Sequence, residues 1–448
     1  MVACGVFILI GRVVLTDMGK SPNILWIVAD CLRYDALSAT EYHRPTTEPI
    51  DDYIETDFIS FSDAATQSGF TLTVLSSLIT GDYPSTHGVL RWDNQFPENV
   101  FTYRDAADSA DLPPVEAIPG MNFISEEWNL TGAFDNVHSL SEEKSRRDCN
   151  QATADEICET ALDRIDEEDE FNLLLWFFDL HDPWLSKPEF EGDNPKRDQY
   201  DTELQFLSIQ LNKLFIELEN RGLYDDTLII FTGDHGDVFS EYRRLPWSTT
   251  GAIAEKIPGL KKAIRGDGYL GHLGRPLFDE IVHVPLFIKL PDNENGGQTT
   301  PGQVELIDIL PTILDVADED VGFSTDGKSI LPMIRGTDDG KNYVRAILEA
   351  NPANGRFSMV RSDKFKFIQH YNPRFNQLRE NPLLYTARRF ITPREVLLRR
   401  ENERENIIQS NPMMAKKMRK HVSPLETKRR SNGVGDAKRK ELEDLGYL

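Results

Sequence analysis

The sequence predicts an α/β fold with a mostly parallel central sheet and helices on both of its faces. Four short apolar runs, residues 23–30, 171–183, 226–237 and 283–291, have the composition of buried strands. Apolar residues occupy both faces of each run, which is typical of strands inside a parallel sheet. Helical segments separate these runs, and alternation of strands with helices indicates this architecture.

Helical periodicity supports the same fold class. Residues 201–222 place five leucines on one side and end at a glycine, which is a common helix stop: Leu204, Leu207, Leu211, Leu214 and Leu218. Residues 152–169 and 304–317 are further helix candidates. After residue 343 the pattern loosens, and residues 357–371 alternate as in an exposed β-meander. We therefore predict a small C-terminal α+β subdomain over residues 344–448, ending in a basic tail.

The composition excludes some classes of partner. The chain has 448 residues, a net charge of −25 and a pI of about 4.8. A surface this acidic repels nucleic-acid phosphate and anionic membranes, so we expect neither as a partner. The same acidity is halophile-like, because acidic surfaces keep proteins soluble at high salt, although composition alone leaves this open.

The cysteines and the N-terminus indicate a cytoplasmic protein. The chain has four cysteines: Cys4, Cys31, Cys149 and Cys158. Their spacing matches neither a zinc site nor a disulfide framework, which favours a reducing compartment. The apolar run 2–10 is too short to span a bilayer and resembles a signal peptide poorly. We expect residues 1–20 to be an extension with translation starting at Met18. An uncleaved membrane anchor is the alternative.

Polar side chains follow three of the four predicted strands. Asp30 ends the first, Asp179 and His181 end the second, and Asp234 and His235 end the third. Ligands of open α/β sheets bind beyond the carboxyl ends of the strands, so these groups are expected to share one site. The alternative is that these residues only start turns. That explanation is sufficient for one strand, but it would require the same coincidence at all three.

Asp30, Asp234 and His235 have the chemistry of a divalent-cation site. Two carboxylates and an imidazole supply mixed oxygen and nitrogen ligands. Calcium prefers oxygen alone, so the imidazole favours Mn, Mg or Zn without resolving which. One bound cation would lower the pKa of a coordinated hydroxyl and offset the charge of a phosphate or sulfate.

Thr71 is the candidate nucleophile. It precedes residues 72–80, which are plausibly helical, and threonine is a favoured N-cap. Backbone N–H groups and the positive end of the dipole at a helix N-terminus also bind anions. A metal-activated Thr71 oxygen could therefore attack phosphorus or sulfur. The alternative is an ordinary N-cap whose hydroxyl is occupied by the helix.

Six motifs in order resemble the sulfatase branch of the alkaline phosphatase superfamily, over nearly all of the chain after Ser21. They are NILWIVADCLRYDALS, TLTVLSSLITGDYPSTHGV, FFDLHDPW, FTGDHGD, GHLGRPLFDEIVHVPLFIKLP and VELIDILPTILDVADED. The first and fourth resemble the metal-binding segments, and the second resembles the nucleophile helix with its following turn. The resemblance implies a catalytic domain over residues 21–343.

The resemblance also implies roles for matched positions. Four residues would hold the cation: Asp30, Thr71, Asp234 and His235. His181 would contact the substrate or protonate the leaving group, and Asp179 of the same segment is expected to bind substrate. His272 or Arg275, with His272 preferred, would stabilise the transferred group or the leaving oxygen.

Other family positions are harder to match. The region 113–138 does not identify the Lys/His pair that many sulfatases place there, and Asn136 and His138 are the candidate substitutes. His87 and Arg33 lie in family-like stretches and are weaker candidates for substrate contacts.

The sequence departs from the family at the nucleophile. True sulfatases carry Cys-x-Pro-Ser-Arg or Ser-x-Pro-x-Arg, whose first residue becomes formylglycine, whereas residues 71–75 here are Thr-Leu-Thr-Val-Leu. No formylglycine is therefore expected. Threonine in this place resembles the phosphodiesterases, phosphonate hydrolases and phosphoglycerol transferases of the superfamily. Cys31 also replaces a second Asp, which lowers the expected calcium affinity.

We predict a metal-dependent hydrolase or transferase of sulfate or phosphate esters, on a small molecule or a glycan, with Thr71 as nucleophile. Phosphorus is favoured by the residues and sulfur by the family resemblance. A phosphodiesterase or phosphoglycerol-type transferase is the first alternative, and a non-catalytic anion- or glycan-binding module the second. A two-metal phosphatase would need Asp179 and His272 as extra ligands, and the Asp-x-His spacing of Asp179 and His181 fits this pattern poorly.

Overall fold

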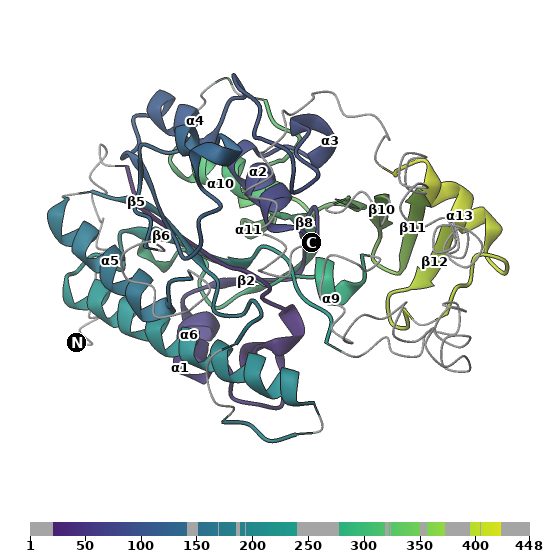
Figure 1. Cartoon of the computed structure of the whole chain (residues 1–448), viewed down its shortest axis with the longest axis horizontal. Helices are drawn as coiled ribbons and strands as arrows, with labels where there is room; N and C mark the ends of the chain where they lie inside the picture. Colours follow the sequence, from purple (N-terminus) through teal and green to yellow (C-terminus); the bar gives the residue numbers. More distant parts are fainter. Residues whose placement is uncertain are drawn as a thin grey trace, which may run out of the picture.

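The computed structural model of the chain describes residues 21–140, 151–168, 170–184, 189–192, 194–239, 277–318, 322, 324–349, 356–371, 395–403 and 405–422. His272 and Arg275 lie outside the described residues. The described chain forms an eight-stranded sheet with helices on both faces, and a four-stranded sheet to one side of it (Figure 1).

The large sheet is mostly parallel, as predicted. Its strands lie in the order β4 (Asn136–Val137), β3 (Val115–Pro119), β5 (Asn172–Phe177), β1 (Asn23–Ala29), β6 (Thr227–Gly233), β7 (Leu286–Lys289), β2 (Ile59–Ala65) and β8 (Thr299–Glu305). Strand β7 is antiparallel to both of its neighbours. Our prediction of residues 283–291 as a parallel strand is therefore wrong in direction. A strand buried on both faces is apolar throughout in either orientation.

Side chains of β1 alternate between two cores. Ile24, Trp26 and Val28 belong to the core on one face, and Leu25 and Ile27 belong to the core on the other. The first face is covered by α2 (Thr71–Thr80), α4 (Tyr103–Ser109), α10 (Ile309–Val316) and α11 (Leu331–Ile334). The second is covered by α1 (Glu48–Thr56), α5 (Ala154–Glu167) and α6 (Pro195–Asn220) (Figure 1).

Helix α6 confirms the predicted leucine stripe, because all five of its leucines are fully buried. It begins at Pro195, a residue type that favours the first turn of a helix. Shorter elements join the main ones: α3 (Pro84–His87), α9 (Asp279–Val282), η1 (Tyr34–Ala36), η2 (Ser38–Thr40), η3 (Glu126–Trp128), η4 (Thr131–Ala133), η5 (Pro291–Asn293) and η6 (Leu306–Asp308). Among the described residues, no helix is long and apolar enough to cross a membrane.

The second sheet is antiparallel throughout. It consists of β12 (Glu395–Arg399), β11 (Phe365–Tyr371), β10 (Arg356–Arg361) and β9 (Val344–Leu348), and α13 (Pro412–Arg419) packs against it. We predicted residues 357–371 as an exposed meander. The exposure is wrong, since Arg361 and Lys366 are fully buried along with their apolar neighbours.

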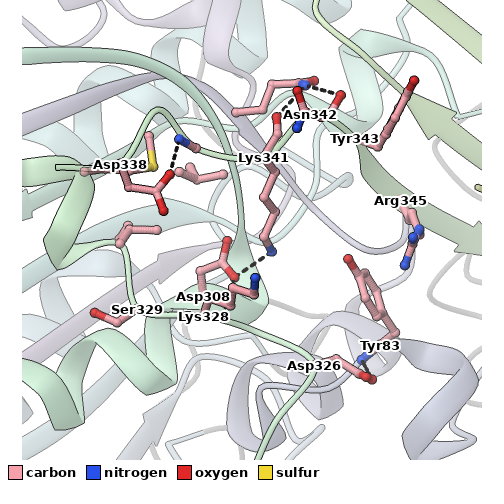
Figure 2. A pocket seen from close by; sticks show the side chains of 15 residues that line it. Tyr83, Asp308, Asp326, Lys328, Ser329, Asp338, Lys341, Asn342, Tyr343 and Arg345 are labelled. Atoms are coloured by element: carbon pink, nitrogen blue, oxygen red, sulfur yellow. Dashed lines mark hydrogen bonds and ion pairs between the residues drawn. The ribbon is translucent and has the colours of Figure 1, made fainter. Parts of the chain in front are cut away.

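A cavity of about 440 Å³ lies beside the end of β8 and the start of β9 (Figure 2). Tyr83, which follows α2, and the loop from Asp326 to Ile330 complete its wall. The cavity therefore lies between the large sheet and the first strand of the small one.

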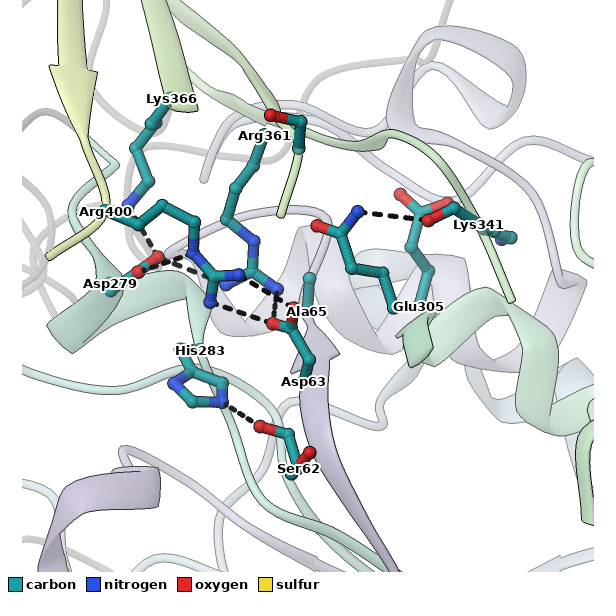
Figure 3. Close-up of polar contacts among 12 residues, drawn as sticks. Ser62, Asp63, Ala65, Asp279, His283, Glu305, Lys341, Arg361, Lys366 and Arg400 are labelled. Carbon is teal, nitrogen blue, oxygen red and sulfur yellow. Dashed lines mark hydrogen bonds and ion pairs between the residues drawn. The ribbon is translucent and has the colours of Figure 1, made fainter. Parts of the chain in front are cut away.

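A charged cluster joins the two sheets (Figure 3). Arg361 contacts Asp63 of β2 at 2.7 Å and Asp279 of α9 at 3.1 Å. Lys366 contacts Asp279 at 2.7 Å, and Arg400 contacts Asp63 at 2.7 Å. Buried charges persist in folded proteins when opposite charges compensate them, so these contacts explain why β10 and β11 carry buried cations.

Candidate active site

The predicted metal ligands lie side by side where β1 and β6 end. Ala29 pairs with Gly233 in the parallel register, so the residues that follow, Asp30 and Asp234, are neighbours. Asp30, Asp234 and His235 are all fully buried. The structure therefore brings together the three residues that the strand ends predicted.

Close backbone contacts hold the two loops that follow these strands. The Gly236 N–H donates to the carbonyl oxygen of Ile281 in α9 at 2.8 Å, and a Cβ atom at Gly236 would lie 2.0 Å from the carbonyl oxygen of Glu280. Cys31 has a φ of 62°, and its N–H donates to Asp234 Oδ1 at 3.1 Å. Each loop is thus fixed by a neighbouring segment.

The hydrogen bonds of His235 define which ring nitrogen faces the site. Its Nδ1 lies 2.9 Å from the carbonyl oxygen of Gly236, and a carbonyl oxygen can only accept, so Nδ1 carries the proton. In the neutral ring, Nε2 then holds a lone pair. This atom lies 3.3 Å from Thr71 Oγ1 and 3.5 Å from Asp234 Oδ2. Metal-binding imidazoles are commonly oriented by such a bond from the other nitrogen.

Thr71 is the first residue of α2 rather than its N-cap. Phe70 occupies the N-cap position, and no side chain there caps the helix. The Thr71 hydroxyl instead donates to Asp30 Oδ2 at 3.0 Å. The N-cap assignment is therefore wrong by one residue, and the alternative that the helix occupies this hydroxyl is excluded.

The donor set fits a divalent cation. Asp30 Oδ1 and Asp234 Oδ2 are buried and have no hydrogen-bond partner among the described residues. Burial, and next the nearby Asp30 carboxylate, raise the pKa of Asp234 well above its usual range, so this pair needs positive charge to stay ionised. Two carboxylate oxygens, His235 Nε2 and Thr71 Oγ1 are ligands that a cation such as Mn²⁺, Mg²⁺ or Zn²⁺ accepts.

Cys31 lies behind this donor set. Its Sγ is 3.9 Å from His235 Nδ1, the ring nitrogen that already donates to Gly236. Burial, reinforced by Asp30, raises the pKa of the Cys31 thiol. Ligand atoms of Asp30, Cys31 and His235 lie within 4.8 Å of one another, so the thiol is a further candidate ligand beside the oxygen donors.

A family model described as Sulfatase matches residues 22–319. The chain belongs to the sulfatase family. A second model, described as the C-terminal part of N-sulphoglucosamine sulphohydrolase, matches residues 272–381. The sequence resemblance and the fold class are both confirmed.

One curated relative and two solved structures are similar to this chain. A low-salt glycan biosynthesis sulfotransferase, Agl7 of Haloferax volcanii, is 26% identical over 320 residues, covering 67% of this chain and 62% of that protein. A structure solved with its substrate D-glucosamine-2-N,6-O-disulfate superposes with a TM-score of 0.68 at 16% identity, covering 95% of this chain and 99% of that one. A phosphonate monoester hydrolase of Agrobacterium radiobacter gives a TM-score of 0.64 at 16% identity, covering 95% and 96%. At these identities the two solved structures show the fold alone.

Within this sulfatase-family site, Asp179 contacts a helix. Its Oδ1 accepts from the N–H of Ala154, the first residue of α5, at 3.2 Å. Because the N-terminus of a helix favours negative charge, this contact gives Asp179 a structural role. Its predicted contact with substrate stays a prediction.

His181 lies beyond the end of β5 and is 5% exposed. Its Nδ1 donates to the carbonyl oxygen of Asp182 at 2.6 Å, because that oxygen can only accept. The nitrogen that can exchange a proton is therefore Nε2. Nε2 has a proton to donate only when the ring is protonated at both nitrogens, so the predicted role at the leaving group requires the imidazolium form and stays a prediction.

Asn136 and His138 lie at the other end of the sheet. Both side chains contact the Glu116 carboxylate, at 3.1 Å and 2.7 Å, and Arg164 pairs with the same carboxylate at 3.0 Å. Glu116 pairs with Leu173 near the start of β5, whereas the candidate metal ligands follow strand ends. The contacts with Glu116 give both side chains a structural role, and their predicted contact with substrate stays a prediction.

His87 and Arg33 are held inside the protein. His87 Nδ1 accepts from the Val89 N–H at 3.1 Å, so its Nε2 donates to Ser77 Oγ at 3.0 Å. The Arg33 guanidinium forms two bonds of 2.7 Å with Asp35. Both side chains therefore make structural hydrogen bonds to neighbouring residues of the protein.

Ser68 and Thr73, which flank Thr71, were not singled out from the sequence. Both are buried, and neither hydroxyl has a hydrogen-bond partner among the described residues. In a segment rich in serine and threonine, only the distances to Asp30 and His235 distinguish Thr71 from these neighbours.

Proposed function

We propose that this protein transfers the sulfuryl group of a sulfate ester to Thr71 and then to water or a second alcohol, using one divalent cation. The observation that supports this most is the position of the Thr71 hydroxyl. It begins a helix, it is 3.0 Å from Asp30 Oδ2, and it is 3.3 Å from His235 Nε2.

In the first step, Thr71 Oγ1 bonds to sulfur in line with the leaving alcohol, and the ester S–O bond breaks. The hydroxyl proton goes to Asp30 Oδ2, which already accepts it. The leaving oxygen takes a proton from Nε2 of His181 in its imidazolium form or from His272, whose roles rest on the family resemblance. The cation on Asp30, Asp234 and His235 supplies Lewis acidity and charge neutralisation.

In the second step, water or an acceptor alcohol attacks the sulfur of the Thr71 ester. The bond between sulfur and Oγ1 breaks, and Oγ1 recovers its proton from Asp30. The proton of the attacking water or alcohol returns to the imidazole that protonated the leaving oxygen. Hydrolysis and transfer share this step and differ only in the acceptor. The likeness to a sulfotransferase supports including an alcohol acceptor in the proposal.

A phosphate ester is the second candidate substrate, and two residues favour it. Threonine stands where a sulfatase carries the precursor of formylglycine, and Leu75, buried in the core, stands where an arginine is expected. A sulfate ester of plain threonine lacks the easy release that a formylglycine hydrate provides. A phosphodiesterase or phosphoglycerol-type transfer would use the same Thr71, Asp30 and His235.

The decisive experiment compares an aryl sulfate, an aryl phosphate monoester and an aryl phosphodiester as substrates. Each is assayed with Mn²⁺, Mg²⁺, Ca²⁺ and Zn²⁺ at several salt concentrations. We expect Thr71→Ala to lower kcat on the preferred ester by a factor on the order of 10³ or more. Thr73→Ala is the matched control, since it removes a buried hydroxyl two residues along the same helix, and its activity should stay near that of the wild type.

Two further measurements separate the alternatives. Mass spectrometry of the quenched reaction should find one transferred group on the peptide that contains Thr71. Elemental analysis should find one cation per chain, lost in Asp234→Asn. Full activity of Thr71→Ala would refute the nucleophile, and bound metal without turnover of any ester would favour the non-catalytic alternative.

A further inference from the structure

The cavity beside β8 has the size and chemistry of a binding site. Its volume of about 440 Å³ lies within the usual range of ligand pockets, about 300–1,000 Å³. Its lining comes from β8, the loop before α11 and the start of β9, and includes Tyr83, Gln303, Lys341, Tyr343 and Arg345 (Figure 2). None of these residues takes part in the proposed reaction.

Two lining side chains carry unmet hydrogen-bonding groups. Arg345 Nε and Gln303 Oε1 are buried and have no partner among the described residues. The amide of Gln303 is oriented by its other atom, because Nε2 donates to the carbonyl oxygens of Lys341 and Asn342 at 3.0 Å and 3.2 Å. Each of these atoms is costly to leave unpaired, and both belong to residues that line the same cavity.

The acidic side chains of the cavity lining, and Glu305 next to it, accept hydrogen bonds from the protein itself. Asp338 Oδ1 accepts from the Gly340 N–H at 2.7 Å. Glu305 Oε2 accepts from the Tyr83 hydroxyl at 2.6 Å and from Lys341 at 2.8 Å. Asp308 Oδ1 accepts from Lys341 at 2.6 Å, and Asp326 Oδ2 accepts from the Tyr83 N–H at 3.1 Å. The carboxylates thus stabilise the wall. The backbone N–H of Arg345 donates to Glu305 Oε1 at 2.8 Å, while its guanidinium has no carboxylate partner among the described residues.

An aromatic face accompanies the unpaired arginine. The guanidinium of Arg345 lies over the Tyr83 ring, 5.5 Å from its centroid. Tyr343, on the same wall, stacks against His421 at 4.1 Å, which holds its ring in place. A fixed aromatic ring beside a guanidinium provides apolar contact together with a charged donor, and this combination suits a polar ring with an anionic substituent.

The cavity and the reaction site lie at the same edge of the sheet. Strand β8 runs parallel to β2 and to β1, so the end of β8 at Glu305 and the end of β1 lie at the carboxyl edge. Four strand spacings separate the two strands in the sheet order, which is about 19 Å. An extended anionic oligosaccharide could reach both places.

We propose that this cavity binds a sugar unit that carries a sulfate or carboxylate group, as a second subsite for an anionic glycan. Arg345 binds the anionic group, Gln303 Oε1 accepts from a sugar hydroxyl, and the Tyr83 ring packs against the sugar. The link to a glycan substrate rests on the proposed function, whereas binding at the cavity does not.

Equilibrium titration with single sugars tests the site. The probes are glucosamine 6-sulfate, glucuronate and glucose, titrated calorimetrically into the protein and into variants in the same metal-containing buffer. We expect Arg345→Met to weaken binding of the anionic probes about ten- to hundredfold at one site, the loss typical of a charge-assisted hydrogen bond. Arg345→Lys should recover part of it. Arg335→Met is the matched control, because Arg335 is exposed on the neighbouring α11 end and lines no part of the cavity.

Further variants separate the cavity from the reaction site. Asn342→Trp, which fills the cavity from an exposed lining position, should also abolish this binding, while Thr71→Ala should leave it unchanged. Hydrolysis of a small aryl ester by Arg345→Met should match the wild type, and KM for a sulfated oligosaccharide should rise. Unchanged binding in folded Arg345→Met and Asn342→Trp proteins would overturn the subsite. If no ester reacts but the anionic probes bind as expected, the proposed function fails and the site stands.

Discussion

His283 makes the stability of the protein depend on pH in a defined direction. It follows α9, its Nε2 donates to the carbonyl oxygen of Ser62 at 3.0 Å, and its ring stacks on Tyr34 at 4.2 Å. Burial, and next the nearby Arg361, lower the pKa of His283 from 6.5 to about 4. The folded protein therefore keeps this imidazole neutral, whereas the unfolded chain protonates it below pH 6.5.

The size of the effect follows from these values. The unfolded state binds the additional proton between pH 6.5 and about 4, so the free energy of unfolding falls as the pH drops through this window. The full difference in pKa corresponds to about 3 kcal/mol. Because the His283 residue is only partly buried, we expect about 1–3 kcal/mol.

Urea denaturation in small pH steps measures this effect. The variant His283→Gln keeps a donor for the Ser62 carbonyl but does not titrate. The stability of the wild type relative to this variant should be constant above pH 6.5 and should decline toward pH 4. The surrounding groups, Asp63, Asp279, Arg361 and Arg400, are the same in both proteins. A difference that stays constant over the whole range would refute the assignment of a buried neutral imidazole.

Two substitutions test the segments around the site. Asp279→Asn leaves three buried or partly buried cations without full compensation, and we expect a loss of about 3–5 kcal/mol in the free energy of unfolding by urea. Asp363→Asn, whose side chain is 74% exposed, should change it little, and equal effects would contradict the reasoning. Gly236→Ala places a Cβ atom 2.0 Å from a carbonyl oxygen of α9, and metal affinity and kcat/KM should fall on the order of tenfold to hundredfold. Gly132→Ala, which meets no atom within 4 Å, serves as its control, and wild-type metal affinity in Gly236→Ala would exclude a positioning role for this contact.

The residues of the candidate metal site could be brought together from the sequence because the signal lies in the strand ends. Asp30 and Asp234 each follow an apolar run, and parallel strands bring such positions to one edge without knowledge of the long-range contacts. His235 follows directly in the sequence. Thr71 needed the family resemblance, because nearby hydroxyls such as Ser68 and Thr73 are equally buried and only three-dimensional distances separate them.

The hydrophobic pattern predicted the wrong exposure for β10 and β11, where burial depends on charged residues distant in the sequence. Arg361 and Lys366 give β10 and β11 the appearance of exposed strands, although both residues are fully buried against Asp63 and Asp279. Alternation of apolar and charged residues says nothing about such partners. Strand β8 was not predicted, because its sequence is polar and contains Pro301 and Gly302. It lies at the edge of the sheet, where proline and glycine are tolerated.

The charged cluster also bears on how the chain reaches its folded state during synthesis. Asp63 and its partner Arg400 are 337 positions apart, so Asp63 can be neutralised by Arg400 only after nearly all of the chain has been made. Contacts of such long separation form late and slow the folding of the regions that need them. A nascent chain that ends before β10 would hold the carboxylates of Asp63 and Asp279 without their cations, and chaperones and proteases would meet it in that state.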